Sequence, residues 1–323
     1  MTDWRYRKGL QEVGDGVWAY LQPDGSWGWS NAGLVADGDQ SLLVDTLFDL
    51  NLTRGMLADM RRATAAAQAI GQVVNTHANG DHCWGNQLVG GAEIIASKRG
   101  ALEMADVPAA MLAQLMAAAP TMGDLGTYLQ RIFGDFDFNG IDMVLPTKTF
   151  EGDMTCRVGD KDVRLIEVGP AHTQGDVLVH VPADRVLYSG DILFIEGHPV
   201  MWAGPVGNWI AACDRILGMD LDVIVPGHGP ITDKAGVIQL RDYLAYLQTE
   251  SRLRYDAGMP AEEAARDIAL DAYAGWSDAE RICVNVKTLY GEFSGKQTEF
   301  DVIALFTDMA RFAHERGLHG LGD

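Results

Sequence analysis

The stretch NTHANGDHCWGN, residues 75–86, places two histidines, an asparagine and an aspartate within six positions. It is one residue short of the metal-binding pattern His-x-His-x-Asp-His, because Asn79 stands where a second imidazole would be. Imidazole and carboxylate are the expected ligands of zinc, and they also serve iron and manganese. The stretch is therefore either a metal site, an altered metal site, or a polar turn that contains two histidines.

The spacing inside this stretch predicts which of its side chains could serve the same metal. In an extended loop side chains alternate with period two, so residues 77 and 79 point the same way. They are placed to serve one metal, while Asp81 and His82 reach a second. The apolar run QVVNTH, residues 72–77, precedes the motif and predicts that the loop leaves the end of a buried strand.

Three later segments also end a predicted strand with a candidate ligand. GPAHTQGD contains His172, LYSGDIL contains Asp191 and VPGHGP contains His228. Strands are rigid, so ligands at their ends are held in fixed positions, and the neighbouring glycines let the backbone turn tightly. Each segment alone has an ordinary explanation as a turn, a packing histidine or a helix cap. Together, in this order, they predict one metal centre.

The rest of the chain predicts a core with two helical additions. A helix is expected over 52–71, ending at Gly71, and residues 98–140 read as a helical insertion broken at Pro108 and Pro120. The methionines of the insertion either fill the core or form a pliable lid. We expect a core over 1–235 and a helical extension over 236–323 packed on it. Short strands are expected at 16–22, 41–46, 72–77, 93–97, 162–169, 176–182, 185–193 and 222–227.

Composition narrows the classes of partner. The 323 residues carry a formal net charge of -20, which disfavours nucleic acid and anionic membrane, since both are bound largely through Lys and Arg. No apolar run approaches the ~20 residues of a membrane helix, and the first residues lack a signal sequence, so we expect a cytoplasmic protein. We expect a small-molecule substrate and leave a homodimer open. Four well-separated cysteines predict free thiols: Cys83, Cys156, Cys213 and Cys283.

With the four ligand-bearing segments in this order, the sequence resembles the metallo-β-lactamase-fold hydrolase superfamily over most of residues 10–235. SNAGLVADGDQSLLVDT, residues 30–46, looks like the family's first hairpin with its strand-terminal Asp45. The resemblance implies an α/β fold, an αββα sandwich with the site at one edge of two facing sheets. It also implies that His77 and His172 bind a first metal, that Asp81, His82 and His228 bind a second, and that Asp191 bridges both.

The departure from the family pattern is Asn79. Its amide is neutral and a poor zinc donor beside imidazole, so the first site is expected to be the weaker one. Two unequal metals, one metal in the second site, and a metal-free relic are the three outcomes. We expect one or two zinc ions, with iron or manganese as alternatives, because the six other ligands are present. Asn79 is also placed to hydrogen-bond a substrate or a metal-bound water.

The resemblance implies a hydrolase. A metal-activated water would attack an ester, thioester, lactone or amide, with Asp81 orienting it and passing a proton, and with Asp191 required for metal binding. The C-terminal helices and the start SWGWSNAG, residues 26–33, resemble a bacterial subgroup, some of whose members are similar to thioesterase/cyclases of aromatic polyketide pathways. His198 and Trp202 are further candidates for substrate contact, and Trp27 and Trp29 either line the pocket or belong to the core.

Two other functions stay open. Some families of this fold bind a single iron and oxidise thiols with similar ligands. A non-catalytic protein that keeps the fold and binds a small ligand is the second alternative, for which Asn79 is the only argument in the sequence. The acidic charge disfavours the nuclease branches, and the absence of a signal sequence disfavours a periplasmic β-lactamase.

Overall fold

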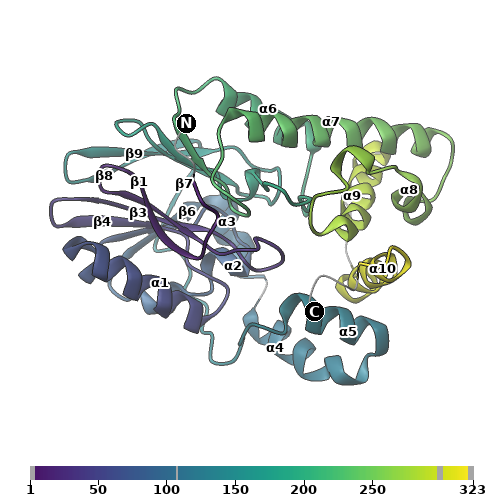
Figure 1. Cartoon of the computed structure of the whole chain (residues 1–323), viewed down its shortest axis with the longest axis horizontal. Helices are drawn as coiled ribbons and strands as arrows, with labels where there is room; N and C mark the ends of the chain where they lie inside the picture. Colours follow the sequence, from purple (N-terminus) through teal and green to yellow (C-terminus); the bar gives the residue numbers. More distant parts are fainter. Residues whose placement is uncertain (1–3, 107, 297–300, 319–323) are drawn as a thin grey trace.

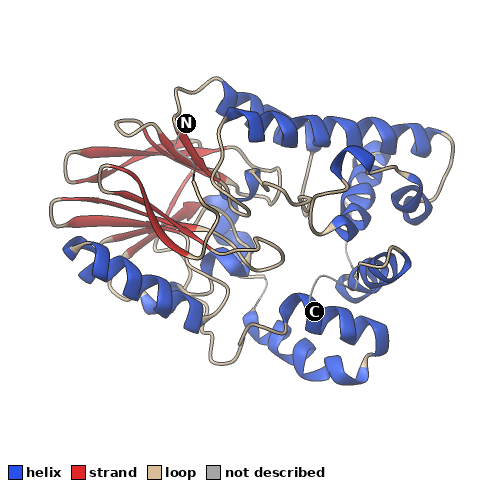
Figure 2. Ribbon diagram, in the orientation of Figure 1, coloured by secondary structure: helices blue, strands red, loops and turns tan. Residues whose placement is uncertain are grey.

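The structure is a computed structural model that describes residues 4–106, 108–296 and 301–318. Its strands form two facing sheets (Figures 1 and 2). The first sheet has the strand order β1-β2-β3-β4-β5-β6-β7, and the second has the order β12-β11-β10-β9-β8. The strands are β1 Gly9–Gly14, β2 Val17–Leu21, β3 Ala32–Asp37, β4 Gln40–Val44, β5 Gln72–Val74, β6 Glu93–Ser97, β7 Lys148–Phe150, β8 Asp153–Val158, β9 Lys161–Glu167, β10 Val177–Val181, β11 Val186–Tyr188 and β12 Val223–Val225.

Helices cover the outer faces of the two sheets and continue beyond them on one side of the molecule (Figure 1). Helix α1 lies outside the first sheet and α6 beside the second, and α7 continues from α6 over the helical part of the molecule (Figure 1). The helices are α1 Leu50–Ala63, α2 Gly80–Cys83, α3 Lys98–Met104, α4 Ala109–Ala118, α5 Gly123–Phe133, α6 Val206–Leu217, α7 Lys234–Asp256, α8 Ala261–Asp267, α9 Ile282–Ser294 and α10 Val302–Glu315.

The core explains why the sheets face each other. Val35 and Val44 of the first sheet and Leu165 and Val179 of the second belong to one buried cluster between them. Side chains alternate along each strand, so neighbouring residues such as Leu43 pack outward against α1 instead. The result is helix, sheet, sheet, helix, and the predicted αββα sandwich is confirmed. The four cysteines are buried and free, also as predicted.

Strand direction brings the ligand-bearing segments together. Strands β4 to β7 run parallel to one another, and so do β11 and β12. Each parallel strand delivers the residues that follow it to the same edge of its sheet. The loops after β4, β5, β11 and β12 therefore meet at one edge of the sandwich.

One predicted helix is shorter than expected. Helix α1 ends at Ala63, because Thr64 has an extended backbone (φ -145°, ψ 142°) and its hydroxyl accepts a hydrogen bond from the Ala66 amide. A separate 3-10 turn, Ala65–Gln68, follows it. The predicted continuation of the helix to Gly71 is therefore wrong. Thr64 ends the helix through its cap, although the alanine-rich sequence around it favours a longer helix.

The segment 98–140 lies against the C-terminal helices. Helix α4 starts directly after Pro108, and Pro120 lies in the 3-10 turn that precedes α5. The rings of Phe133 on α5 and Phe306 on α10 are 6.0 Å apart. A lid function for this segment stays a prediction. In the described part of the chain no single helix is long and apolar enough to cross a membrane, although α3 and the helical run 109–121 pass that test together as a bent pair.

Candidate metal centre

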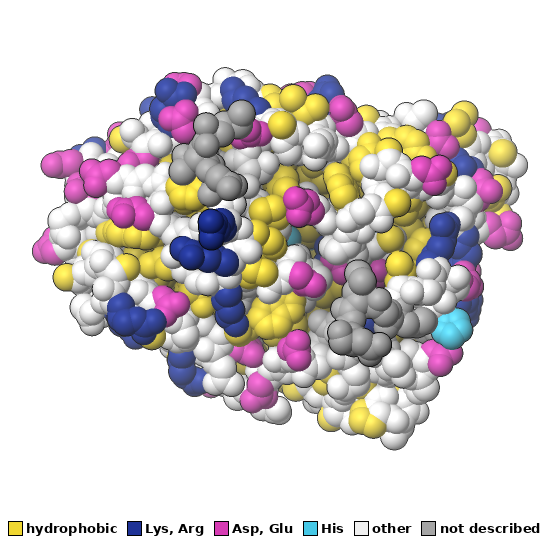
Figure 3. All heavy atoms as spheres, viewed as in Figure 1, with side chains coloured by type: hydrophobic (Ala, Val, Ile, Leu, Met, Phe, Trp, Pro, Cys, Tyr) yellow, Lys and Arg dark blue, Asp and Glu magenta, His cyan; other side chains and the backbone are white. Residues whose placement is uncertain are grey.

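Six side chains converge where the strand ends meet, in two groups of three. His77, His172 and Asp191 form one group, and Asp81, His82 and His228 form the other. In each group the potential ligand atoms all lie within 4.8 Å of one another. These are the six residues singled out in the sequence, and their roles as metal ligands stay a prediction. Hydrophobic side chains gather over this part of the molecule, between the sandwich and the helical part, with acidic side chains among them (Figure 3).

Asp191 is central to the cluster. Its carboxylate oxygens lie 3.7 Å from His77 Nε2, 3.1 Å from His82 Nε2, 3.3 Å from His172 Nε2 and 3.4 Å from His228 Nε2. A Cβ atom on residue 227 would lie 1.9 Å from Asp191 Oδ1, so only Gly227 allows the His228 loop to approach this closely. One carboxylate thus faces all four imidazoles.

The imidazoles are oriented by contacts on their other nitrogen. Asp45 Oδ2 lies 2.9 Å from His82 Nδ1, and the Val200 carbonyl lies 2.6 Å from His172 Nδ1. The Gly25 carbonyl, at 3.0 Å, contacts Nδ1 of His228, and the Thr76 hydroxyl, also at 3.0 Å, contacts Nδ1 of His77. All four rings are held through Nδ1, which leaves Nε2 directed inward. Such contacts orient metal-binding histidines in proteins.

The donor set fits a cation. His77 Nε2, His82 Nε2 and Asp191 Oδ1 are buried and make no well-formed hydrogen bond within the described residues, although His82 Nε2 and Asp191 Oδ1 lie 3.1 Å apart as an ion pair. Buried polar atoms are nearly always hydrogen-bonded, so three such atoms at one point require an explanation. Inward-facing imidazole nitrogens and carboxylate oxygens are zinc-type ligands, and a bound metal would satisfy them.

Asn79 lies within this centre. Its backbone is extended (φ -68°, ψ 144°) and it forms the N-cap of α2. Its Oδ1 lies 2.7 Å from His172 Nε2, the nitrogen that faces Asp191. The sequence analysis placed the whole motif in a loop, whereas Asp81 and His82 lie on the short helix α2. One helical turn, rather than strand alternation, directs these two side chains to the second group.

The contact of Asn79 with His172 would compete with metal binding if the amide nitrogen, rather than Oδ1, faced the ring. Burial lowers the pKa of His172 to about 4, so the ring is neutral at pH 7. The Val200 carbonyl only accepts, so the single ring proton sits on Nδ1 and Nε2 keeps its lone pair. A half-turn of the amide presents the Asn79 NH2 group to that lone pair. In that orientation the amide occupies the electron pair that a metal would use.

The two groups differ in charge when no metal is bound. Burial lowers the pKa of His77 well below its usual value. Burial alone would also lower the pKa of His228, but the carboxylates of Asp191 and Asp81 outweigh it and raise that pKa to about 9. The same carboxylates raise the pKa of His82. At pH 7 the first group is therefore neutral at its histidines, whereas the second holds protons.

This difference predicts the pH dependence of metal loading. A metal must displace the protons of both His228 and His82, so the zinc affinity of the second group should rise between pH 7 and 9, about tenfold per pH unit for each proton displaced. Calorimetric titration in two buffers of different ionisation enthalpy measures the protons released. Zinc uptake without proton release at pH 7 would contradict this charge assignment.

Several residues that the sequence analysis did not single out support the centre. Asn31 Nδ2 donates to the carbonyls of Pro226 and Gly229, on either side of His228, at 3.0 and 2.8 Å. The Ser30 hydroxyl donates to the Asp81 carbonyl at 2.5 Å. Both belong to the SNAG segment, whose presence was noted only as part of the resemblance. The available signal was a pair of polar residues directly before the apolar strand β3.

The other predicted pocket residues lie in different surroundings. His198 Nδ1 lies 2.9 Å from the Tyr243 hydroxyl on α7, and His198 is outside both ligand groups. The Trp202 amide donates to the His172 carbonyl at 3.0 Å, which places its backbone beside the centre. Trp27 is buried, with its ring 6.3 Å from that of Trp202. Trp29 is partly buried and packs against Phe136 at 4.8 Å. Contact of these side chains with a substrate stays a prediction.

A buried arginine lies behind the second group. The Phe194 ring stacks on His228, with centroids 5.0 Å apart and planes at 3°. The Arg281 guanidinium lies 5.4 Å from the Phe194 centroid and 4.3 Å from that of Trp27. Arg281 also pairs with Asp278 at 3.2 Å. The residues that precede α9 thus form the back wall of the centre.

Helix α9 also holds the carbonyl that orients His172. Asn285 Oδ1 accepts from the Met201 amide at 2.8 Å, and its Nδ2 donates to the Pro199 carbonyl at 2.9 Å. Val200 lies between these two residues, and its carbonyl contacts His172. Asn285 is itself buried. One side chain 113 positions away in sequence therefore fixes the partner of a metal ligand.

Replacing Asn285 by Leu should lower the zinc affinity of the first group, which contains His172, about 10- to 100-fold. This is the usual cost of losing a residue that orients a metal ligand. Competition with a coloured chelator measures the affinity, and the visible spectrum of the cobalt-loaded protein reports the ligand geometry. Leu289→Ala, which removes a buried side chain from the same helix, is the matched control for general destabilisation. Equal zinc affinity in Asn285→Leu and the unchanged protein would refute this role.

Comparison with known proteins gives the family that this chain matches and several of its relatives. The family model described as the metallo-beta-lactamase superfamily matches residues 25–228. The chain is 26% identical over 192 residues to the 2,4-dinitroanisole O-demethylase subunit alpha of Nocardioides sp. (strain JS1661), and 24% identical over 182 residues to the linear primary-alkylsulfatase of Pseudomonas sp. (strain ATCC 19151). These matches cover 55% and 50% of the chain, but only 51% and 34% of those proteins. The chain thus spans about half of the first and a third of the second.

A third relative matches over more of its length. The acyl-coenzyme A thioesterase MBLAC2 of Homo sapiens is 23% identical over 244 residues, which cover 70% of the chain and 81% of that protein. Among solved structures, a metallo-beta-lactamase from Pontibacter korlensis aligns with a TM-score of 0.56 at 19% identity, over 74% of the chain and 99% of that protein. The sec-alkylsulfatase Pisa1 from Pseudomonas sp. aligns with a TM-score of 0.66 at 17% identity, over 89% and 50%. The structural likenesses concern the fold alone.

Proposed function

The chain belongs to the metallo-beta-lactamase superfamily, and from this premise we propose that it is a metal-dependent hydrolase that cleaves an ester, thioester, lactone or amide of a small organic substrate. The observation that carries the proposal is the convergence of six zinc-type ligands around Asp191. Thioesters are the first class to test, because the thioesterase relative matches over most of its own length.

We propose zinc as the metal, with iron or manganese as the alternatives to be tested. His77, His172 and Asp191 would hold one ion, and Asp81, His82 and His228 another. A zinc ion bound there supplies Lewis acidity and lowers the pKa of a bound water to about 7. Because Asn79 takes the place of a third imidazole, we propose that the second group is occupied first.

Asp81 is the residue best placed to handle a proton. Its side chain is 13% exposed, whereas those of the other five ligands are at most 4% exposed. Burial alone would raise its pKa, but His82 and His228 outweigh burial and lower it, so Asp81 is ionised at neutral pH. A carboxylate at the open side of the cluster can accept a proton from an attacking water and pass it to the leaving group.

A cluster of buried aromatic side chains includes Trp84, which directly follows α2, the helix that carries Asp81 and His82. Phe48 and Trp84 stack with centroids 5.1 Å apart, and Phe136 and Phe138 pack on Phe48 at 4.9 Å each. An apolar wall of this kind favours a substrate with an apolar group beside the scissile bond. We therefore propose acyl or aryl substrates rather than sugars or nucleotides.

The test is a matched substrate panel. The protein is stripped with a chelator, reloaded separately with zinc, manganese and ferrous iron, and assayed on a thioester, an oxygen ester, a lactone and an anilide with the same acyl group, and on an alkyl sulfate. We expect metal-restored hydrolysis, fastest on the thioester. Oxygen consumption with a thiol only in the iron form would instead indicate a thiol oxygenase. Failure of every metal to bind would indicate a non-catalytic binding protein.

A further inference from the structure

Along one row of residues, the outer face of the second sheet changes from apolar to polar. Leu187, His180, Arg164 and Thr155 are successive register partners across β11, β10, β9 and β8. Register partners point to the same face of a sheet. Leu187 is buried in the cluster that includes α6 residues. Beyond it the row continues as three hydrogen-bonding side chains that no helix covers fully.

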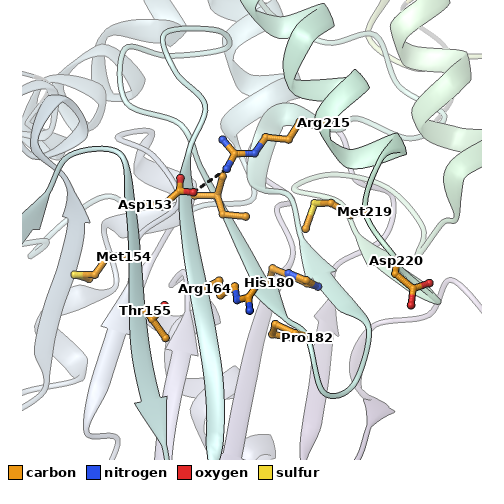
Figure 4. Close-up of a pocket in the computed structure, with 10 residues that line it drawn as sticks. Asp153, Met154, Thr155, Arg164, His180, Pro182, Arg215, Met219 and Asp220 are labelled. Carbon is orange, nitrogen blue, oxygen red and sulfur yellow. Dashed lines mark hydrogen bonds and ion pairs between the residues drawn. The ribbon is translucent and has the colours of Figure 1, made fainter.

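A cavity of about 780 Å³ lies over this polar part of the row (Figure 4). Its size is within the range of small-molecule sites, about 300 to 1,000 Å³. The sheet forms its floor, and the end of α6 with the residues that follow forms one side (Figure 4). Apolar walls come from Ile166, Pro182 and Met219. The remaining lining residues are Asp153, Met154, Thr155, Arg164, His180, Arg215 and Asp220.

Two neighbouring donors in this cavity lack acceptors. His180 is 8% exposed, and its Nε2 is buried without a hydrogen-bond partner among the described residues. Arg164, directly opposite on β9, is exposed to solvent, and its side chain makes no hydrogen bond or ion pair with the part of the chain that the structure describes. Burial and the neighbouring Arg164 lower the pKa of His180, so this ring is a neutral donor or acceptor at pH 7.

The acidic residues of the cavity are already paired. Asp153 contacts Arg215 at 2.9 Å, and Asp220 contacts Arg185 at 2.8 Å (Figure 4 shows the first pair). Arg164 is therefore the cation of the cavity that no carboxylate neutralises. In a chain with a net charge of -20, carboxylates outnumber cations by 45 to 25, so an unpaired arginine beside an unpaired buried imidazole is a specific feature.

We propose that this cavity binds a small organic oxyanion, a carboxylate or phosphate that carries a short apolar group. Its oxygens accept hydrogen bonds from the Arg164 guanidinium, from His180 Nε2–H and from the Thr155 hydroxyl. Arginine offers two parallel N–H groups that match a carboxylate or phosphate. The apolar group lies against Ile166, Pro182 and Met219. This site is separate from the six-ligand centre and does not depend on the proposed hydrolase activity.

The test uses the zinc-loaded protein with hexanoate and hexyl phosphate as probes. Two-dimensional NMR of the histidine rings is recorded during each titration, and the His180 signal is identified by its loss in His180→Gln. We expect the His180 signal to shift saturably, which separates binding here from binding at the zinc ions. Arg164→Gln should weaken the binding about 10- to 100-fold, since it removes a charge-assisted pair.

Arg157→Gln is the matched control. Arg157 lies two residues beyond Thr155 on β8, is exposed, and pairs with Asp162 at 2.7 Å outside the cavity lining. It removes the same charge from the same sheet, so its affinity should equal that of the unchanged protein. Saturation by only one probe would identify the head group as carboxylate or phosphate. No shift of His180 with either probe, or equal losses in Arg164→Gln and Arg157→Gln, would overturn the proposal.

Discussion

Replacing Asp191 by Ala is expected to abolish metal binding and hydrolysis together. The variant removes the one carboxylate that faces all four imidazole Nε2 atoms, at 3.1 to 3.7 Å. It also removes the strongest attraction that raises the pKa of His228. We expect metal content per chain to fall close to zero, and activity to fall at least about 10³-fold, since metal activation contributes several kcal/mol to catalysis.

Elemental analysis of the purified protein and the thioester assay measure the two losses. Asp184→Asn is the matched control, because Asp184 has a similarly buried side chain, 6% against 4% exposed, and pairs with Lys161 away from the centre. It should retain both metal and activity. Full activity in Asp191→Ala would refute the metal centre as the site of catalysis.

Replacing Asn79 by His should have the second-largest effect, in the opposite direction. The amide is 2.7 Å from His172 Nε2, so the side chain at position 79 already reaches the first group. An imidazole there would complete three histidines with Asp191 and add a strong donor. We expect zinc affinity of the first group to rise about 10- to 1,000-fold, and the zinc content to approach two ions per chain.

Asn79→Ala distinguishes two reasons for this gain. It removes the amide that contacts His172 but adds no ligand. If only Asn79→His binds the additional zinc tightly, the missing imidazole limits the first group. If Asn79→Ala gains as much zinc affinity, the contact of the amide with His172 limits zinc binding by the first group, and the number of ligands does not. A gain in neither variant would contradict the assignment of position 79 to this group.

The fold and the ligands were predictable because their signals are local. EIIAS is apolar and bounded by turn residues, and the strand observed is Glu93–Ser97, as predicted. The candidate ligands follow apolar, strand-like runs of this kind in the sequence. The expectation of ligands at strand ends therefore identified them. Helix α2 was missed because its four residues carry no apolar period, and a turn this short leaves no repeating pattern to detect.

What supports the ligands was not predictable, because those contacts join distant parts of the chain. Asn285 acts on Pro199 and Met201, and nothing near residue 285 indicates a polar role inside an apolar helix. Arg281, fully buried against Trp27 and Phe194, reads in the sequence as an ordinary surface charge. Conversely, His198 had the local appearance of a pocket residue, but its hydrogen bond goes to Tyr243.

The dependence of His172 on Asn285 sets an order of events on the ribosome. The last ligand, His228, is synthesised 57 residues before Asn285, which corresponds to about 3 to 11 seconds at 5–20 residues per second. During that interval all six ligands exist, but the carbonyl that orients His172 is not yet held by α9. A nascent chain would therefore capture its metal loosely and exchange it readily. If the centre holds a metal, we expect the position of His172 to become fixed only after α9 has docked, late in biosynthesis.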